Sequence, residues 1–401
     1  MKICGVIAEY NPLHLGHVRH LALARQASGA DALVVVMSGP FVQRGEPAIA
    51  DPVVRAQWAV GAGADLVLEL PAAYACHGAQ LFARGAVGLL DGLGCISCFC
   101  FGCETPDLSQ LMPVARLLMA EPEAFKARLR YELSRGASYP RARQLALTPI
   151  LGEAAASLMT QANNVLALEY LQACLHLGSR LEPLPVARVG DGYRQRQIKS
   201  SLPSATGIRA ALAAGHMPDG LPLPVRRALE KSPGIFPSQM GPLIRWGLLT
   251  ASDQALADLP DMGEGLHLRL KAAARSAVDY AGILEAAATR RYSQTRIQRA
   301  LLHCLLAMDQ KDTELLRCPH PLFVRPLAMG DQGRRLLSLI GRSSTLPLIV
   351  HPARYCPDGM PAQRLWAINQ RAWTLYALLA GRPDGWAYET RLTPLPPWPA
   401  D

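Results

Sequence analysis

Two histidines three positions apart, His14 and His17, stand in a short polar segment that follows the first apolar run of the chain. Imidazoles donate hydrogen bonds to phosphate oxygens and titrate near neutral pH, so a bound phosphate can keep them protonated. Gly16 between them has no side chain where backbone and ligand must approach closely. A helix beginning near His17 would also point its free N–H groups at an anion. The spacing predicts a phosphoryl-transfer site, whereas the plainer alternative is two histidines that cap and pack.

The elements that must position this segment follow a regular alternation. Strand-length apolar runs cover residues 2–8, 32–37, 66–70 and 95–101, and helical patterns fill the gaps between them. This pitch is typical of βαβ units, so we expect an α/β fold with a Rossmann-like parallel sheet. The second helix is predicted to begin at Pro52 with Asp51 as its cap. In such sheets ligands bind at the carboxyl ends of the strands, where His14 and His17 fall.

The second half of the chain has a different character. A short apolar run covers residues 185–189, and a Ser-Ala-Thr-Gly-Ile-Arg turn follows at residues 204–209. Six prolines then fall between Pro218 and Pro242, and this density predicts a boundary. We therefore expect an α/β domain over residues 1–215 and a mainly helical domain over residues 216–401.

Composition narrows the class of protein. Half of the 401 residues are hydrophobic and 18% are charged, which excludes a wholly disordered chain. Lys and Arg outnumber Asp and Glu by 41 to 32, and the net charge of +9 favours a polyanionic partner. No run of 18 apolar residues and no signal-peptide pattern occurs, so we expect a cytoplasmic protein without a membrane partner. Nothing in the sequence indicates a stable protein partner.

The cysteines resemble a metal motif, but their spacing argues against one. Cys95, Cys98, Cys100 and Cys103 read as CxxC-x-CxxC, whereas a zinc site draws two pairs from turns a dozen or more residues apart. In a strand, Cys98 and Cys100 would face one side while Cys95 and Cys103 face the other. We expect reduced, structural cysteines and no metal site. The remaining histidines considered, His77, His176, His267, His320 and His351, are scattered through the chain.

Residues 14–17, His-Leu-Gly-His, resemble the HxGH signature of the nucleotidyltransferase superfamily. A longer ordered series resembles the tRNA(Met) cytidine acetate ligase family. It comprises residues 5–12, 37–39, 41–48, 63–71, 101–104, 163–166 and 204–209. The sequence contains no GxxxxGK[ST] and no complete GxGxxG, which disfavours a P-loop ATPase or an ordinary dinucleotide enzyme.

This resemblance implies a two-step reaction. Acetate and ATP would give acetyl-adenylate and pyrophosphate, and the acetyl group would pass to the N4 amine of the wobble cytidine in elongator tRNA(Met). Mg²⁺ would be carried with ATP. The residues implied in catalysis are His14 and His17. Those implied in ATP binding are Ile7, Ala8, Glu9, Tyr10, Asn11, Pro12, Leu13, His14, Leu15, Gly16, His17, Val18, Arg19, His20, Gly102, Asn163 and Arg188. Ser204, Thr206 and Arg209 resemble the motif that holds the leaving pyrophosphate.

A basic region in the helical half suits a nucleic-acid partner. Between Arg269 and Arg299, seven basic residues stand against two acidic ones, a local net charge of +5. Arg291, Arg296 and Arg299 lie near Tyr292, a combination that suits phosphate contact and base stacking. A solvated helix face is the alternative. Because residues 291–299 also resemble the tRNA-contacting part of the family, we expect these three arginines to bind tRNA.

Two other functions remain open from the sequence. A small-molecule adenylyltransferase of cofactor biosynthesis would use the same α/β domain, but it needs no basic helical half. An RNA-binding protein with a nucleotide site but no catalysis would not need the His14, Gly16 and His17 group or Arg209. Release of pyrophosphate with acetate, and consumption of acetate that depends on tRNA, distinguish the three.

Overall fold

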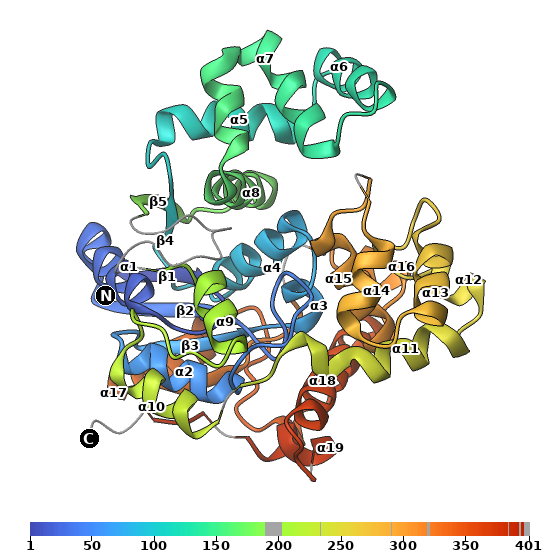
Figure 1. The fold of residues 1–401 in the computed structure, drawn as a ribbon. Helices are drawn as coiled ribbons and strands as arrows, with labels where there is room; N and C mark the ends of the chain where they lie inside the picture. Colours follow the sequence, from blue (N-terminus) through green and yellow to red (C-terminus); the bar gives the residue numbers. More distant parts are fainter. Residues whose placement is uncertain are drawn as a thin grey trace.

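A six-stranded sheet forms the centre of the computed structural model, which describes residues 1–188, 203–232, 234–289, 291–318, 321–383, 385–392 and 394–396. The strands lie in the order β5-β4-β1-β2-β3-β6 (Figure 1). Their bounds are β1 (Ile3–Ala8), β2 (Ala32–Ser38), β3 (Leu66–Leu70), β4 (Cys98–Cys103), β5 (Glu182–Ala187) and β6 (Pro326–Met329). The first five pair in parallel, as expected, while β6 from the C-terminal half pairs with β3 in antiparallel orientation.

Both faces of the sheet are buried along β1 to β4, because these strands are nearly continuous apolar runs whose successive side chains point to opposite faces. In β2, Val34 and Val36 pack into one core, while Val35 and Met37 pack into the other. Helices α1 (Leu15–Ser28) and α2 (Pro52–Gly61) supply side chains to the second core. Helices α3 (Ala72–Ala75), α4 (Ala79–Gly92) and α8 (Ala162–Leu177) supply the first. The cap predicted for α2 is confirmed, since Asp51 accepts a hydrogen bond of 2.8 Å from the Val53 N–H.

Strand β4 begins three residues later than the sequence predicts. Gly94 has a positive φ of 68°, and the pairing of β4 with β1 starts where Cys98 lies opposite Cys4. The predicted alternation is correct, because Cys98 and Cys100 pack into one core and Cys103 into the other. Cys95 lies before the strand and packs against the same core as Cys103. All ten cysteines are free thiols.

Two helical lobes extend from the sheet (Figure 1). The first is an insertion between β4 and α8, made of α5 (Leu108–Ala120), α6 (Glu123–Ser134) and α7 (Tyr139–Ser157). The second lies in the C-terminal half and contains α11 (Gly241–Thr250), α12 (Asp253–Ala257), α13 (Leu266–Ser276), α14 (Tyr280–Ala287), α15 (Gln294–Leu305) and α16 (Gln310–Leu315). Residues 266–288, which are rich in Ala and Leu, form two helices and not one. Asp279 separates them by capping α14, accepting a hydrogen bond of 2.8 Å from the Gly282 N–H.

The proline-rich stretch near the predicted boundary is partly helical. Helix α9 (Ala205–Ala213) precedes it, and α10 (Leu223–Lys231) lies within it, with Pro224 in its first turn. Beyond the second lobe, α17 (Asp331–Ser343) follows β6, and α18 (Gly359–Leu379) leads to α19 (Gly385–Tyr388). The C-terminal half therefore completes the sheet of the N-terminal half as well as forming a lobe. No helix in the described part of the chain is long and apolar enough to cross a membrane.

Candidate functional site

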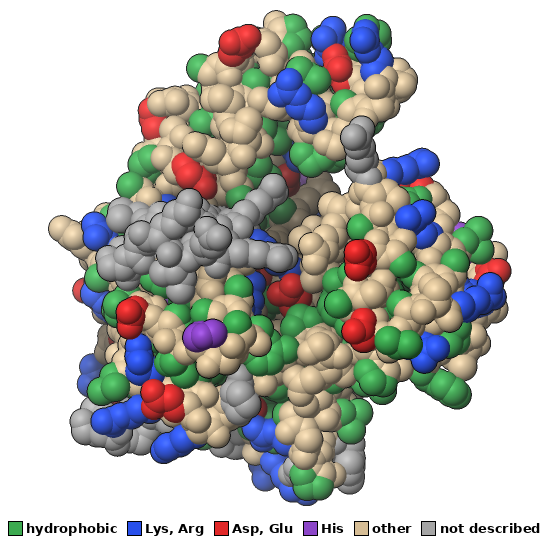
Figure 2. Space-filling view, viewed as in Figure 1, with side chains coloured by type: hydrophobic (Ala, Val, Ile, Leu, Met, Phe, Trp, Pro, Cys, Tyr) green, Lys and Arg blue, Asp and Glu red, His purple; other side chains and the backbone are tan. Residues whose placement is uncertain are grey.

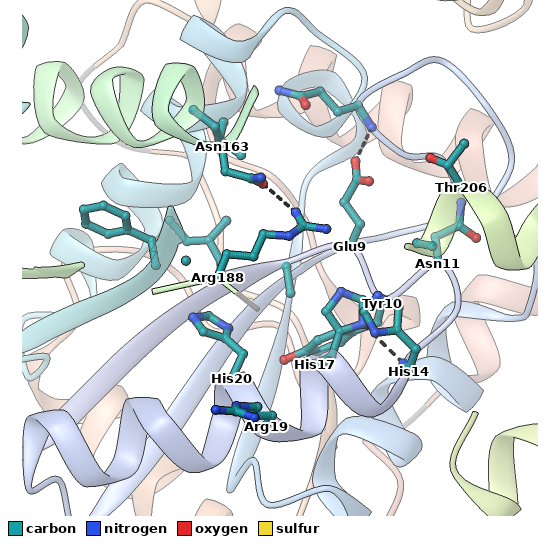
Figure 3. Close-up of a pocket in the computed structure, with 18 of the residues that line it drawn as sticks. Glu9, Tyr10, Asn11, His14, His17, Arg19, His20, Asn163, Arg188 and Thr206 are labelled. Atoms are coloured by element: carbon teal, nitrogen blue, oxygen red, sulfur yellow. Dashed lines mark hydrogen bonds between the residues drawn. The ribbon is translucent and has the colours of Figure 1, made fainter. Parts of the chain in front are cut away.

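A pocket opens where the order of the strands reverses. The chain proceeds from β1 to β2 and β3 on one side, and from β4 to β5 on the other, so β1 and β4 flank a topological switch point. Ile7 and Ala8 at the end of β1 line the pocket, as do Phe101 and Gly102 near the end of β4. The predicted position at the carboxyl ends of the strands is thus the position of the cavity (Figure 3).

His14 and His17 lie together on one wall of this pocket. His14 is the residue before α1, which begins at Leu15, two positions earlier than predicted. The two rings stack with centroids 3.7 Å apart and planes 22° from parallel. The His14 backbone N–H donates to His17 Nδ1 at 3.3 Å, so a neutral His17 carries its proton on Nε2. His14 Nδ1 is buried and has no hydrogen-bond partner in the described chain.

The histidines of the pocket are neutral before any anion binds. Burial, followed by the charges of Arg188 and Arg209, lowers the pKa of His14 to about 3. Burial lowers the pKa of His20 to about 4, with Arg188 as the second cause. The pKa of His17 is lowered in the same way. An anionic ligand opposes these effects, because negative charge nearby favours the imidazolium form. Protonated rings, as expected from the sequence, therefore require the ligand.

A hydrogen-bond chain fixes the opposite wall. The Glu104 carboxylate accepts from Asn163 Nδ2 at 2.6 Å and from the Asn164 N–H at 2.8 Å, and so caps the start of α8. The Asn164 side-chain oxygen accepts in return from the backbone N–H groups of Glu104 and Thr105. Asn163 Oδ1 is then oriented to accept from Arg188 Nη1 at 2.7 Å. The chain holds one guanidinium at the pocket wall.

The loop after β1 is held by a buried arginine. Arg55 Nη1 donates to the Glu9 carbonyl at 2.5 Å, Nη2 donates to the Ser38 carbonyl at 3.0 Å, and Nε donates to the Ala50 carbonyl at 3.0 Å. Nη2 also donates to the Gly39 carbonyl. Because burial removes water from the guanidinium, the pKa of Arg55 falls to about 10. One side chain thus joins the loops that follow β1 and β2.

Helix α9 brings the residues predicted to hold the leaving pyrophosphate to the loop after β1. Arg209 Nη1 donates to the Asn11 carbonyl at 2.7 Å, and its Nη2 lies 3.7 Å from a Glu46 carboxylate oxygen. Thr206 and Arg209 line the pocket. Ser204 does not, because its hydroxyl caps α9 by accepting from the Gly207 N–H at 3.1 Å. Its role in the structure is to start the helix that presents the other two.

Most residues predicted to bind the nucleotide meet in this pocket. Those that line it are Ile7, Ala8, Glu9, Tyr10, Asn11, His14, Gly16, His17, Arg19, His20, Gly102, Asn163 and Arg188. Four do not line it, namely Pro12, Leu13, Leu15 and Val18. Leu13, which precedes the helix, packs in the core, whereas Leu15 at the first position of α1 is exposed to solvent.

Ten further residues of the pocket wall were not predicted from the sequence. They are Leu23, Gln43, Arg44, Phe82, Phe101, Leu166, Tyr170, Ala187, Pro203 and Ala205. Five of them lie inside the segments that carry the family resemblance, but the resemblance implied no role for them. These five are Gln43, Arg44, Phe101, Leu166 and Ala205. Leu23 lies one helical turn after His20, which a helical projection of α1 would have found. Phe82 and Tyr170 had no such signal, since aromatic residues on α4 and α8 read as core.

The charge of the pocket favours an anion. Four arginines, Arg19, Arg44, Arg188 and Arg209, are among its described lining residues, whereas Glu9 is the one acidic residue among them. Arginine suits phosphate because its planar donors can bind two oxygens at once. In the described part of the chain, no three His, Cys, Asp or Glu residues are grouped so that they could hold a metal ion. The arrangement is therefore built to bind and polarise a polyphosphate.

The arginines predicted to bind tRNA lie in the second lobe, where they pair with acidic residues of the same lobe. Arg299 Nε donates to Asp261 Oδ2 at 2.8 Å, and its side chain is 15% exposed. Arg296 Nε donates to the Asp261 carbonyl at 3.0 Å, and Nη1 bonds Glu264 at 3.1 Å. Arg291 is 66% exposed and lies 3.3 Å from Glu264. Arg290, counted in the same basic region, lies outside the described residues.

Comparisons with known proteins agree along the whole chain. The model of the HIGH Nucleotidyl Transferase family matches residues 1–386. A tRNA(Met) cytidine acetate ligase of Acetivibrio thermocellus is 36% identical over 365 residues, which cover 87% of this chain and 88% of that protein. A protein of the same name from Syntrophotalea carbinolica is 37% identical over 409 residues, covering 98% and 96%.

Solved structures of similar shape come from Thermotoga maritima TmcAL. The apo form superposes with a TM-score of 0.92 at 29% identity, with 99% of both chains covered. The form bound with alpha-thio ATP gives a TM-score of 0.90 at the same identity and coverage. The agreement includes both lobes as well as the sheet, because it spans nearly all of each chain.

Proposed function

Since the chain belongs to the HIGH nucleotidyl transferase family, within its tRNA(Met) cytidine acetate ligases, we propose that it is an ATP-dependent ligase that forms N4-acetylcytidine at the wobble position of elongator tRNA(Met). The observation that carries this proposal is the pocket at the β1/β4 switch point, where stacked His14 and His17 face a set of guanidinium groups. A relative with the same overall structure is bound with alpha-thio ATP.

In the first step, acetate attacks the α-phosphate of ATP and pyrophosphate leaves. Acetate is ionised at neutral pH, so its attack needs no general base. The obstacle is repulsion between anions, and the protein opposes it with positive charge at fixed positions. Arg188, held by Asn163, and Arg209, held by the Asn11 carbonyl, would supply that charge. His14 and His17 would add hydrogen-bond donors as the phosphates raise their pKa.

In the second step, the N4 amine of the cytidine attacks the acetyl carbon and AMP leaves. Positioning of amine and acyl-adenylate in one pocket contributes much of the rate of such a transfer. His14 and His17 would stabilise the departing phosphate as they stabilised the entering one. The same groups therefore serve both steps.

Mg²⁺ is proposed to accompany ATP. The pocket supplies one carboxylate among its described residues, whereas Mg²⁺ prefers an octahedron of oxygen ligands. Phosphate oxygens and water would therefore provide most of its coordination. When bound, the ion would neutralise phosphate charge, as the arginines do.

The tRNA is proposed to lie across both halves of the chain. On the face shown in Figure 2, a hollow separates the α5–α7 lobe from the second lobe, and Lys and Arg side chains stand on both sides of it. We propose that residues 1–215 carry the chemistry and that residues 216–401 supply the main tRNA-binding surface. Arg291 would contact the phosphate backbone, while Arg296 and Arg299 hold the surface in shape through Glu264 and Asp261. We propose that the reaction takes place in the cytoplasm, where a tRNA substrate would be met.

The alternative of a small-molecule adenylyltransferase is not favoured. Such an enzyme has no use for the second lobe, yet the ligase relatives match this chain over 87–98% of its length. An RNA-binding protein without catalysis would not need two guanidinium groups and two histidines directed into one pocket.

The deciding experiment follows [14C]acetate into unmodified elongator tRNA(Met), with and without ATP. Wild type is compared with His17→Ala, and with His176→Ala as a control on an exposed histidine of α8. We expect ATP-dependent label at the wobble cytidine with wild type and the control, and its loss in His17→Ala. Absence of label from wild type, with pyrophosphate still released by another acceptor, would contradict the tRNA assignment.

A further inference from the structure

Transfer of the acetyl group requires that the N4 amine lose a proton, and the chemistry above assigns no acceptor for it. We propose that Glu9 is the general base that takes this proton. The proposal rests on the ligase function proposed above and adds a catalytic residue to its second step.

The backbone places Glu9 directly at the reacting end of the sheet. It is the first residue after β1, and its own carbonyl accepts from Arg55 Nη1 at 2.5 Å. Its Oε1 accepts from the Gln43 backbone N–H at 2.8 Å, and Oε2 makes no hydrogen bond with the described residues. Figure 3 shows Glu9 between Arg188 on one side of the pocket and Thr206 on the other. One carboxylate oxygen is thus anchored and the other is available to a ligand.

A carboxylate at this position is unfavourable for binding alone. The pocket must accept the phosphates of ATP and the carboxylate of acetate, and all of these repel a negative side chain. Glu9 is nevertheless present as the one acidic group among the described lining residues. Repulsion of both substrates is tolerable where the group performs chemistry that neither arginine nor a protonated histidine can perform. Acceptance of a proton is such chemistry.

The surroundings of Glu9 adjust its basicity. Burial raises the pKa of the carboxyl, while the Gln43 N–H and the charges of Arg209 and Arg44 lower it and Glu46 raises it. Arg55 and Cys76 also interact electrostatically with Glu9 from α2 and from the end of α3. The net effect is a pKa above that of an ordinary glutamate. A general base works best when its pKa approaches the operating pH, so this change favours proton transfer.

The histidines are poorer candidates for the same role. His17 accepts the His14 N–H at Nδ1, which leaves a proton on Nε2 and makes that atom a donor. His14 and His20 have pKa values of about 3 and 4 before ligand binds, which makes them weak bases. Once phosphates raise those values, the rings are protonated and have no free lone pair. A histidine that is protonated to stabilise phosphate therefore cannot also accept the N4 proton. Glu9 can accept it, which leaves the histidines free to stabilise phosphate.

The step balances without a further reactant. The N4 lone pair forms a bond to the acetyl carbon, and the bond between that carbon and the phosphate oxygen breaks with its electron pair going to AMP. The proton from N4 passes to Glu9 Oε2. Glu9 then returns it to water after AMP and the tRNA leave.

The test separates the two steps in Glu9→Gln, whose amide oxygen can still accept the Gln43 N–H. Acetate-dependent exchange between ATP and pyrophosphate measures adenylation, and it needs no tRNA. Single-turnover transfer of [14C]acetyl from the preformed enzyme-bound adenylate to unmodified tRNA(Met) transcript measures the second step. We expect transfer to slow by about 100-fold relative to exchange. Glu182→Gln serves as the control, because it removes an exposed carboxyl at the start of β5 outside the pocket.

The pH profile supplies a readout that a structural role would not change. The wild-type transfer rate should fall as pH falls through the pKa of Glu9, and Glu9→Gln should lose that dependence. Glu9→Asp keeps a carboxylate and should retain the pH dependence with a partly restored rate. Equal loss of exchange and transfer in Glu9→Gln would assign Glu9 to nucleotide binding and overturn the proposal, as would unchanged transfer. If wild type shows no acetate-dependent exchange, the ligase function itself fails and the assignment of Glu9 falls with it.

Discussion

Arg188 Nη1 donates a hydrogen bond of 2.7 Å to Asn163 Oδ1, and this bond joins the end of β5 to the first turn of α8. The amide of Asn163 is itself held by Glu104 at the end of β4. Three segments far apart in the chain thereby fix one guanidinium at the pocket wall. The position of a charged donor is well defined only when its acceptor is itself held in place, and Asn163 is such an acceptor.

Asn163→Ala should weaken ATP binding. Loss of the acceptor releases the Arg188 guanidinium, and a hydrogen bond to a charged group contributes about 1.5–3 kcal/mol. We expect the KM for ATP in acetate-dependent pyrophosphate exchange to rise by at least about tenfold. Gln172→Ala is the matched control, because the Gln172 amide bonds the Leu168 carbonyl within the same helix. An unchanged KM in Asn163→Ala would show that Arg188 needs no such support.

ATP binding should take up protons near pH 6. His14 and His20 have pKa values of about 3 and 4 in the free protein, and bound phosphates raise those values toward the ordinary 6.5. At a pH between the pKa in the free protein and the pKa in the complex, the ATP-bound state holds more protons than the free protein. The affinity for ATP should therefore increase as pH falls through 6.5. Calorimetry of ATP binding in buffers of different ionisation enthalpy measures this uptake.

The control for proton uptake must remove the contribution of ATP, whose terminal phosphate also titrates in this range. The comparison is therefore between wild type and His14→Asn, with His176→Asn as the exposed-histidine control. We expect smaller uptake in His14→Asn and no change in His176→Asn. Equal uptake in all three proteins would mean that His14 stays neutral in the complex.

Arg55→Lys should destabilise the folded protein. Lysine presents one nitrogen where Arg55 satisfies the carbonyls of four residues, Glu9, Ser38, Gly39 and Ala50, in a buried site. Buried acceptors without partners cost about 1–3 kcal/mol each, so we expect the free energy of unfolding to fall by about 3 kcal/mol. Urea denaturation measures it. Arg335→Lys on exposed α17 should change it by less than about 0.5 kcal/mol.

Arg291→Ala should weaken tRNA binding and leave adenylation unchanged. A single phosphate contact contributes about one counterion to the salt dependence, so the slope of log K against log salt should decrease by about 1. The readouts are tRNA affinity at several salt concentrations and acetate-dependent exchange without tRNA. Arg334→Ala removes an exposed charge from α17 and should alter neither. A slope that stays the same would place the tRNA elsewhere on the surface.

The sequence by itself determined the elements that carry the site. Continuous apolar runs produce β1, β2 and β3 within a residue or so of their predicted bounds, because a strand buried on both faces needs apolar residues at successive positions. Asp51 and Pro52 start α2 as predicted. The HxGH segment lies in the pocket because the end of the first parallel strand leaves no other place for it. These features depend on neighbours in the chain.

Only the tertiary structure decided which distant residues complete the site and the sheet. Strand β6 pairs with β3 across more than half of the chain, and no local pattern records that partner. Phe82 and Tyr170 belong to the core, as their types suggest, but the packing of α4 and α8 also places them at the pocket wall. Ser204 and Leu13 lie in recognisable motifs but serve a helix cap and the core. Motifs define which residues come near a ligand, whereas packing defines which side chains face it.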